Sequence, residues 1–395
     1  MPFIGNKPTA IPLSADDLED NIISTAKIQD NAVTAAKYIE PIPFRNIIIN
    51  GDMSIAQRGT SETGIGNGDT GYHTVDRWKF FENDSPSYEF TMSQSTDVPS
   101  GYGFATSLKM DCTTAEASLA ANDLAFLEHY IEGQNVQYLK KGTANAEYVT
   151  ASFWVKSTKT GTFIVELVDS DNSRFTNFNY TVNASDTWEK KTVSFVPDTT
   201  GTLDNDNAAS LLFRFGLLAG TNFSSGSPSP TTWLANSGNN AKRAANQVNI
   251  ADNTANNFLI TGVQLEAGEV ASDFEFLPVD VNLQRCKRYF QNLAPTGLDN
   301  IRMGIGENKN TTTSGVYIKF EPEMRATPSL SSTAANTFSL YHSATDIVAT
   351  GINFDSKSSK GGNIDVTVSS GLLDGGASQF LTASTSTRLD FSSEL

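Results

Sequence analysis

Short stretches of alternating apolar and polar residues dominate the chain from about Phe44 onward. Residues 148–155, YVTASFWV, have the period of two that places successive side chains on opposite faces of a β-strand. The pattern recurs, separated by clusters of Gly, Asn, Asp and Ser, at residues 163–168, 191–196, 211–215 and 258–265. Many short strands without long helices between them predict a mostly β fold, with two packed sheets in a jelly-roll β-sandwich.

Helical spacing is confined to two stretches of this region. In residues 115–134 the apolar side chains fit a short helix lying over a sheet. In residues 280–293 Leu283, Cys286 and Tyr289 follow one another at intervals of three, which predicts a second helix. Alternation then resumes at residues 316–320, 364–368 and 388–391, and Gly351 and the glycine pairs at 361–362 and 375–376 are the predicted turns.

These patterns divide the 395 residues into four predicted parts. Residues 1–44 form an N-terminal arm that is extended or contains short helices. Residues 45–280 form the jelly-roll domain, residues 281–295 a linking helix, and residues 296–395 a small C-terminal β-sandwich.

The arm contains a near-repeat of nine residues, DNIISTAKI at 20–28 and DNAVTAAKY at 30–38. In one continuous helix the repeated apolar pairs would rotate apart, whereas in a strand they would share a face. Two short helices capped by Asp20 and Asp30 fit equally well. None of these forms buries its apolar side alone, which predicts docking on a copy or another protein; a loosely ordered leader is the alternative. The predicted docking residues are Ile22, Ile23, Ile28, Val33 and Tyr38.

Composition excludes several classes of partner. The 44 acidic and 28 basic residues give a net charge of −16, which repels a phosphate backbone, so no nucleic-acid partner is predicted. The first twenty residues lack a secretory signal pattern, and no apolar run approaches the roughly 20 residues that cross a bilayer. Cys112 and Cys286 are isolated in sequence and are expected to be free thiols, in keeping with assembly in a reducing cytoplasm.

Six strings, in order along residues 44 to 330, carry a resemblance to a known family. They are FRNIIINGDM (44–53), VDRW (75–78), TWEKKT (187–192), VQLEAG (263–268), RCKRYF (285–290) and MRATP (324–328). Together they resemble bacteriophage tail-fibre and virion-structural proteins with a carbohydrate-binding-module-like jelly roll. The N-terminal repeat is similar to the arms of marine-phage fibre proteins.

The resemblance implies a homotrimer located in the virion and assembled in the host cytoplasm. Its N-terminus would dock on other virion proteins, a tail or neck adaptor, and its β domains would adhere to host surface polysaccharide without catalysis. Fold does not fix function, however. A capsid or tail-neck decoration protein that binds only virion neighbours and a polysaccharide depolymerase are the alternatives.

Aromatic rings in polar loops are the expected glycan-binding residues, because a ring face stacks on a sugar while polar neighbours bond its hydroxyls. The loop at residues 220–246 offers Phe223, Trp233, Asn236 and Arg243, and the loop at residues 64–73 offers Tyr72 and His73. The alternative for Trp233 is that it plugs the edge of the sandwich. Core packing is expected for Trp78, Trp154 and Trp188, which lie in or beside strand-like runs.

The sequence predicts no catalytic site and no cofactor. His73 lies three residues from Asp76, but the three histidines show no metal-ligand spacing, so neither a zinc site nor a Ser-His-Asp triad is predicted. No Gly-rich nucleotide loop follows a strand. Because jelly rolls of the resembling kind often carry a structural calcium, the oxygen-bearing residues Asn50, Asp52 and Glu266 are the candidate ligands for that ion.

Overall fold

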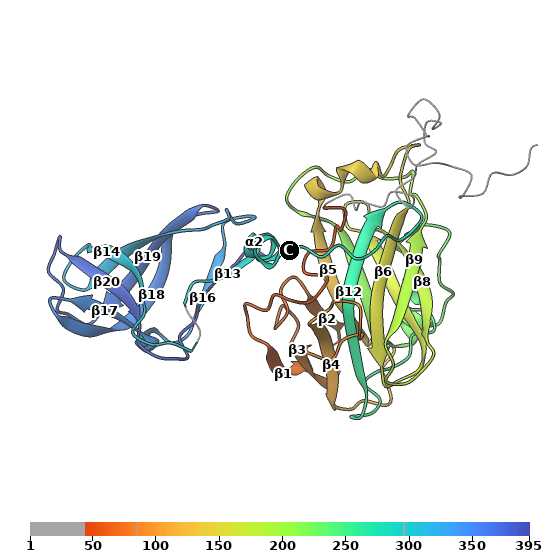
Figure 1. Cartoon of the computed structure of the whole chain (residues 1–395), viewed down its shortest axis with the longest axis horizontal. Coiled ribbons are helices and arrows are strands. Elements are labelled where there is room, and N and C mark those ends of the chain that lie inside the picture. The colour runs from red at the N-terminus through yellow and green to blue at the C-terminus, as the bar shows by residue number, and fades with distance from the viewer. Residues whose placement is uncertain (1–43, 85, 295–296) are drawn as a thin grey trace, which may run out of the picture. The chain divides into compact units, whose positions relative to one another are not determined.

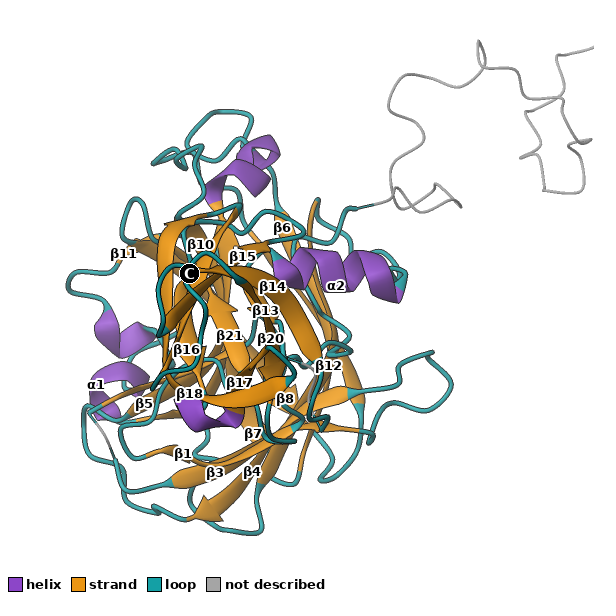
Figure 2. Cartoon of the chain, turned by 90° about the vertical axis from the view of Figure 1, so that its left-hand side faces the viewer, coloured by secondary structure: helices purple, strands orange, loops and turns teal. Residues whose placement is uncertain are grey.

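β-strands are the main regular secondary structure of the computed structural model, which describes residues 44–84, 86–294 and 297–395. Figure 2 shows the few helices as short segments among the strands. The predicted mostly β fold class is therefore confirmed. The docking residues predicted in the arm, Ile22, Ile23, Ile28, Val33 and Tyr38, lie outside the described residues.

Two six-stranded antiparallel sheets form the sandwich predicted from the alternating runs (Figure 1). The first sheet, in spatial order, contains β1 (Ser61–Gly66), β3 (Glu89–Ser95), β4 (Ser107–Thr114), β12 (Asn257–Ala267), β6 (Val149–Ser157) and β9 (Glu189–Phe195). The second contains β11 (Leu234–Ala235), β8 (Arg174–Val182), β7 (Gly161–Asp169), β10 (Ala209–Ala219), β5 (Leu124–Glu132) and β2 (Lys79–Asn83).

The core between these sheets follows the alternation seen in the sequence. In β6 the inward side chains Ala151, Phe153 and Val155 are fully buried. Phe153 meets Phe215 of β10 edge to face, with ring centroids 4.9 Å apart, which is a favoured arrangement for aromatic pairs. The alternate residues of β6 consequently point to the outer face of the first sheet.

The prediction of a helix in residues 115–134 is wrong, because this stretch contains strand β5 (Leu124–Glu132) instead. Ala125 and Leu127 belong to the main core, whereas Leu124 and Phe126 pack in a second cluster that Phe223 covers from the outside. A strand that is buried on both faces has no polar alternation, so its apolar residues also fit a helical spacing.

The linking helix is present as α2 (Val279–Lys287), which ends earlier than the spacing suggested. Phe290 belongs to β13 (Phe290–Asn292), which pairs with β21, so sheet formation replaces the helix after Arg288. The other helices of the described residues are single turns: α1 (Thr221–Ser224) and the 3₁₀ segments η4 (Gly133–Asn135), η5 (Gln137–Leu139), η6 (Asn240–Lys242) and η7 (Ala335–Thr337).

The C-terminal strands close into a barrel, where the sequence predicted a small β-sandwich. Its members, in spatial order, are β14 (Arg302–Asn308), β15 (Thr313–Lys319), β19 (Gly361–Val368), β18 (Thr345–Ser358), β17 (Phe338–His342) and β20 (Ala377–Thr382). A three-stranded sheet of β13, β21 (Leu389–Ser392) and β16 (Ser329–Ser332) accompanies it. Gly351, expected in a turn, lies inside β18 at a register shift, where a bulge replaces the turn.

Two further sequence expectations concern single features. Cys112 and Cys286 are both free, as predicted, and both are buried. Among the described residues, no helix has the length and apolar character needed to cross a membrane.

Candidate functional site

Trp233, the first of the predicted glycan-binding residues, is part of the sandwich core. Its side chain is buried, and its indole nitrogen donates a hydrogen bond of 2.8 Å to the carbonyl oxygen of Val196. The Lys141 ammonium lies 5.0 Å from the ring centroid. The residue therefore plugs the sandwich edge, the alternative that the sequence left open, and offers no ring face to a sugar.

The other residues of the same loop are also engaged within the protein. Arg243 holds the buried Glu166 carboxylate through two hydrogen bonds of 2.9 and 2.8 Å. Phe223 packs over the cluster outside β5, and the backbone of Asn236 donates to the carbonyl of Ser173. The structure does not gather these side chains into an open binding surface, so the loop serves mainly to cover the second sheet.

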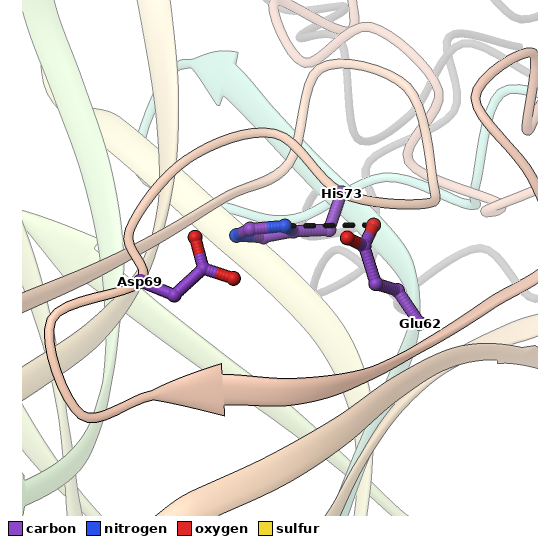
Figure 3. A group of neighbouring side chains, drawn as sticks. All are labelled: Glu62, Asp69 and His73. Atoms are coloured by element: carbon purple, nitrogen blue, oxygen red, sulfur yellow. Dashed lines mark ion pairs between the residues drawn. The ribbon is translucent and has the colours of Figure 1, made fainter. Parts of the chain in front are cut away.

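The second predicted loop places His73 between two carboxylates (Figure 3). Nδ1 of His73 lies 3.6 Å from a carboxylate oxygen of Glu62, and Asp69 faces the other side of the ring. Tyr72 turns elsewhere, since its hydroxyl donates to the carbonyl oxygen of Leu395. The two predicted residues of this loop are therefore not combined in one site.

Asp76, which follows His73 by three residues, is not its catalytic partner. Its carboxylate accepts hydrogen bonds from Gln57, and the Arg58 guanidinium lies 3.8 Å away. Burial raises the pKa of Asp76 to about 6, although Arg58 and Gln57 oppose this shift. The group acts as a buried structural acid.

The three calcium candidates are engaged by protein donors in two separate sets of partners. Asn50 accepts from the backbone N–H of Ile55 and donates to its carbonyl, at 3.0 and 2.9 Å. Asp52 accepts hydrogen bonds from Ser54 and Asn282. Glu266 accepts from Gln264 and Ser272 and lies 3.5 Å from Arg45. Because N–H and O–H donors occupy these oxygens, the arrangement does not fit a shared calcium site.

Two tryptophans that the sequence assigned to the core lie instead on the outer face of the first sheet, together with Tyr102. Trp154 and Trp188 are half-buried and Tyr102 is 57% exposed. The rings of Tyr102 and Trp154 meet with centroids 4.3 Å apart at an angle of 49°. Trp154 pairs with Lys190 of β9, so Trp188, two residues earlier, is its diagonal neighbour on the same face. We call Tyr102, Trp154 and Trp188 the aromatic platform.

Charged side chains hold the platform in place. The Lys156 ammonium lies 2.7 Å from Asp97 and 2.9 Å from Asp186, and Asp97 also accepts a hydrogen bond of 3.0 Å from the Trp188 indole. Partial burial alone would raise the pKa of Asp97, but the hydrogen bonds from Lys156 and Trp188 outweigh it and lower that pKa. The carboxylate is thus charged at neutral pH and fixes the Trp188 ring beside exposed polar groups.

A signal for the platform was present in the sequence. Within TASFWVKS the inward residues are Ala151, Phe153 and Val155, so Trp154 shares its face with Ser152 and Lys156. The core assignment is therefore correct for Trp78, which is fully buried, and wrong for Trp154 and Trp188. Tyr102 could not be placed from its glycine-rich loop.

A polar hollow of about 400 Å³ beside η5 is a weaker candidate for sugar binding. Its lining includes Gln137, Lys140, Thr143 and Asn145 but contains no aromatic ring. It therefore lacks the stacking surface that sugar rings use.

No protein-family model matches the chain, and neither does any curated protein. Similar solved structures include the enzymatically active domain of tailspike protein 4 from bacteriophage CBA120, which is 13% identical with a TM-score of 0.30. That similarity covers 57% of this chain and 22% of the tailspike chain.

Carbohydrate-binding modules are also similar. A family 11 module from Clostridium thermocellum is 9% identical over 54% of this chain and 99% of its own, with a TM-score of 0.27. The CBM22-1 xylan-binding domain of Paenibacillus barcinonensis Xyn10C is 12% identical over 55% and 100%, with a TM-score of 0.23. At identities and TM-scores this low, the similarity assigns no function to this chain.

Proposed function

We propose that this chain is a noncatalytic structural and adhesion protein of a phage particle, a tail fibre that binds host surface polysaccharide on the aromatic platform. The platform is the observation that carries the proposal. It presents the Tyr102, Trp154 and Trp188 rings beside fixed carboxylates and the exposed Lys190. Ring faces stack on sugars, and charged neighbours bond their hydroxyls. The six strings that resemble tail-fibre proteins support the virion role.

Loss of one platform ring is expected to weaken polysaccharide binding substantially. Trp154→Ala removes the ring that contacts Tyr102, and we expect affinity for a soluble oligosaccharide to fall about tenfold or more, equivalent to ~1.4 kcal/mol. The measurement is a screen of the full chain on an array of bacterial capsular and O-antigen polysaccharides, followed by calorimetry with a fragment of the best binder. Tyr317→Ala, which removes a 65% exposed tyrosine of β15, is the matched control.

Each outcome of that screen bears on the proposal. Retention without cleavage, lost in Trp154→Ala and kept in Tyr317→Ala, supports adhesion on the platform. Release of shorter sugars would identify a depolymerase instead. Absence of any retained polysaccharide would favour a decoration protein that binds only virion neighbours, and equal loss in both variants would place the sugar elsewhere.

The oligomeric part of the proposal is a homotrimer whose N-terminal arm docks on a tail or neck protein. Linked copies would strengthen weak single-site binding to a repetitive glycan. Light scattering on the full chain is expected to give three times the monomer mass of 42.6 kDa. A monomer at micromolar concentration would contradict the trimer without affecting the platform.

A further inference from the structure

The strongest unassigned group of side chains joins Glu62, Asp69 and His73. Each offers one ligand atom, and these atoms lie within 4.8 Å of one another (Figure 3). Glu62 belongs to β1, Asp69 to the turn that follows, and His73 to the segment leading to β2. We propose that these three residues bind a divalent transition-metal cation, with zinc as the representative ion.

The backbone around the group is fixed by its own hydrogen bonds. Gly66 and Asp69 exchange two backbone hydrogen bonds of 3.2 and 3.0 Å, which close the turn after β1. Gly71 and Phe80 form a similar pair at 2.9 and 2.8 Å. The carboxylate and the imidazole are therefore held on two short, anchored connections rather than on a free loop.

His73 supplies the observation that points to a ligand. Its side chain is only 8% exposed, and Nε2 is buried without a hydrogen-bond partner in the described residues. The 3.6 Å between Nδ1 and Glu62 exceeds normal hydrogen-bond length. A buried polar atom left unpaired costs free energy, so a bound cation would satisfy a group that the protein leaves unsatisfied.

The two carboxylates are equally available. Apart from the contact between Glu62 and His73, neither Glu62 nor Asp69 has a side-chain hydrogen bond or ion pair in the part of the chain that the structure describes. Figure 3 shows the imidazole lying between them. This separates the group from Asn50, Asp52 and Glu266, whose oxygens already accept hydrogen bonds.

The donor set selects the class of metal. One imidazole nitrogen and two carboxylate oxygens suit zinc and other first-row divalent ions, whereas Mg²⁺ and Ca²⁺ prefer oxygen ligands alone. Bonds of about 2.0–2.2 Å require the ligand atoms to draw together. The Glu62 side chain is 48% exposed and free to move inward, and water would complete the coordination.

Metal binding by the full chain can be measured directly with Zn²⁺ by calorimetry and with Co²⁺ by its visible absorption. We expect a saturable site that Mg²⁺ and Ca²⁺ do not fill. Glu62→Gln and Asp69→Asn should each weaken binding about tenfold or more, and His73→Gln should abolish it. Glu307→Gln, which neutralises an exposed strand carboxylate in the barrel, is the matched control.

Glu62 and Asp69 are both exposed, so Glu62→Gln and Asp69→Asn are expected to leave the core intact and the variants folded. The proposal is supported if zinc raises the melting temperature of the parent chain and of Glu307→Gln but not of Glu62→Gln or Asp69→Asn. It is overturned if no zinc binds, or if binding is unchanged in all three ligand variants. It is also overturned if the variants alter only the pH dependence of stability, which would indicate a protonated His73 paired with the two acids.

Discussion

Replacing Trp78 with alanine is expected to lower the free energy of unfolding by about 3–5 kcal/mol, the usual cost of removing a large buried aromatic side chain. Its ring is fully buried and packs near His129 and Phe215, with centroids 5.2 and 6.0 Å away. Its indole also donates a hydrogen bond of 3.2 Å to the carbonyl of Asn50, which would lose its donor. Urea unfolding followed by circular dichroism measures the change.

Trp188→Ala is the matched control for this prediction. Trp188 is half-buried on the outer face, and its indole bonds the partly exposed Asp97. Its loss is expected to cost about 1 kcal/mol or less, because water replaces the lost partner. Equal destabilisation of the two variants would contradict the assignment of one tryptophan to the core and the other to the surface.

Replacing Glu132 with alanine should also be destabilising, by about 2–3 kcal/mol, because it leaves the buried Tyr289 hydroxyl and the Arg288 guanidinium, which is 32% exposed, without their acceptor. The carboxylate is fully buried at the end of β5 and accepts two hydrogen bonds of 2.8 Å from Arg288, together with one from the Tyr289 hydroxyl. It thereby ties the sandwich to the segment after α2. Glu147→Ala, which breaks the exposed pair with Lys140, should cost less than about 1 kcal/mol.

The stabilisation that Glu132 provides should be lost as the pH falls. Burial alone would raise its pKa, but the hydrogen bonds from Arg288 and Tyr289 outweigh burial and lower it. A carboxyl with a lowered pKa stabilises the fold above its unfolded-state pKa and loses that contribution as the pH falls through the folded-state value. The difference between the parent chain and Glu132→Ala should stay constant at neutral pH and shrink below about pH 4. An unchanged difference at pH 3 would refute the ion-pair explanation.

The comparison of Trp154 with Trp233 explains why site residues were harder to predict than strands. Both stand in polar or mixed surroundings in the sequence, yet Trp233 is buried and Trp154 is on the surface. Strand parity would have placed Trp154 outward, because Phe153 and Val155 fix the inward face of β6, but the prediction assigned this residue to the core. No local rule places Trp233, since its burial depends on a loop that folds back to reach the carbonyl of Val196.

His73 shows the same limit for candidate metal ligands. Spacing among the three histidines gave no metal site, because the ligands that the structure brings to His73 are carboxylates from β1 and the following turn. For calcium the error was the reverse, because the sequence predicted ligands that the structure does not bring into a metal site. Asn50, Asp52 and Glu266 have suitable oxygens, but nearby N–H and O–H donors already occupy them.

The sequence by itself determined the mostly β fold and the positions of five of the twelve sandwich strands, β6, β7, β9, β10 and β12, because half-buried strands must alternate and turns need particular residues. It did not determine β5, whose two buried faces remove the alternation, or the closure of the C-terminal strands into a barrel. Only the tertiary structure decided which polar side chains have hydrogen-bond or ion-pair partners. That selection brought Tyr102 against Trp154 and left the Nε2 atom of His73 unpaired, because these side-chain contacts are set by how strands and loops pack and not by the local alternation of residues.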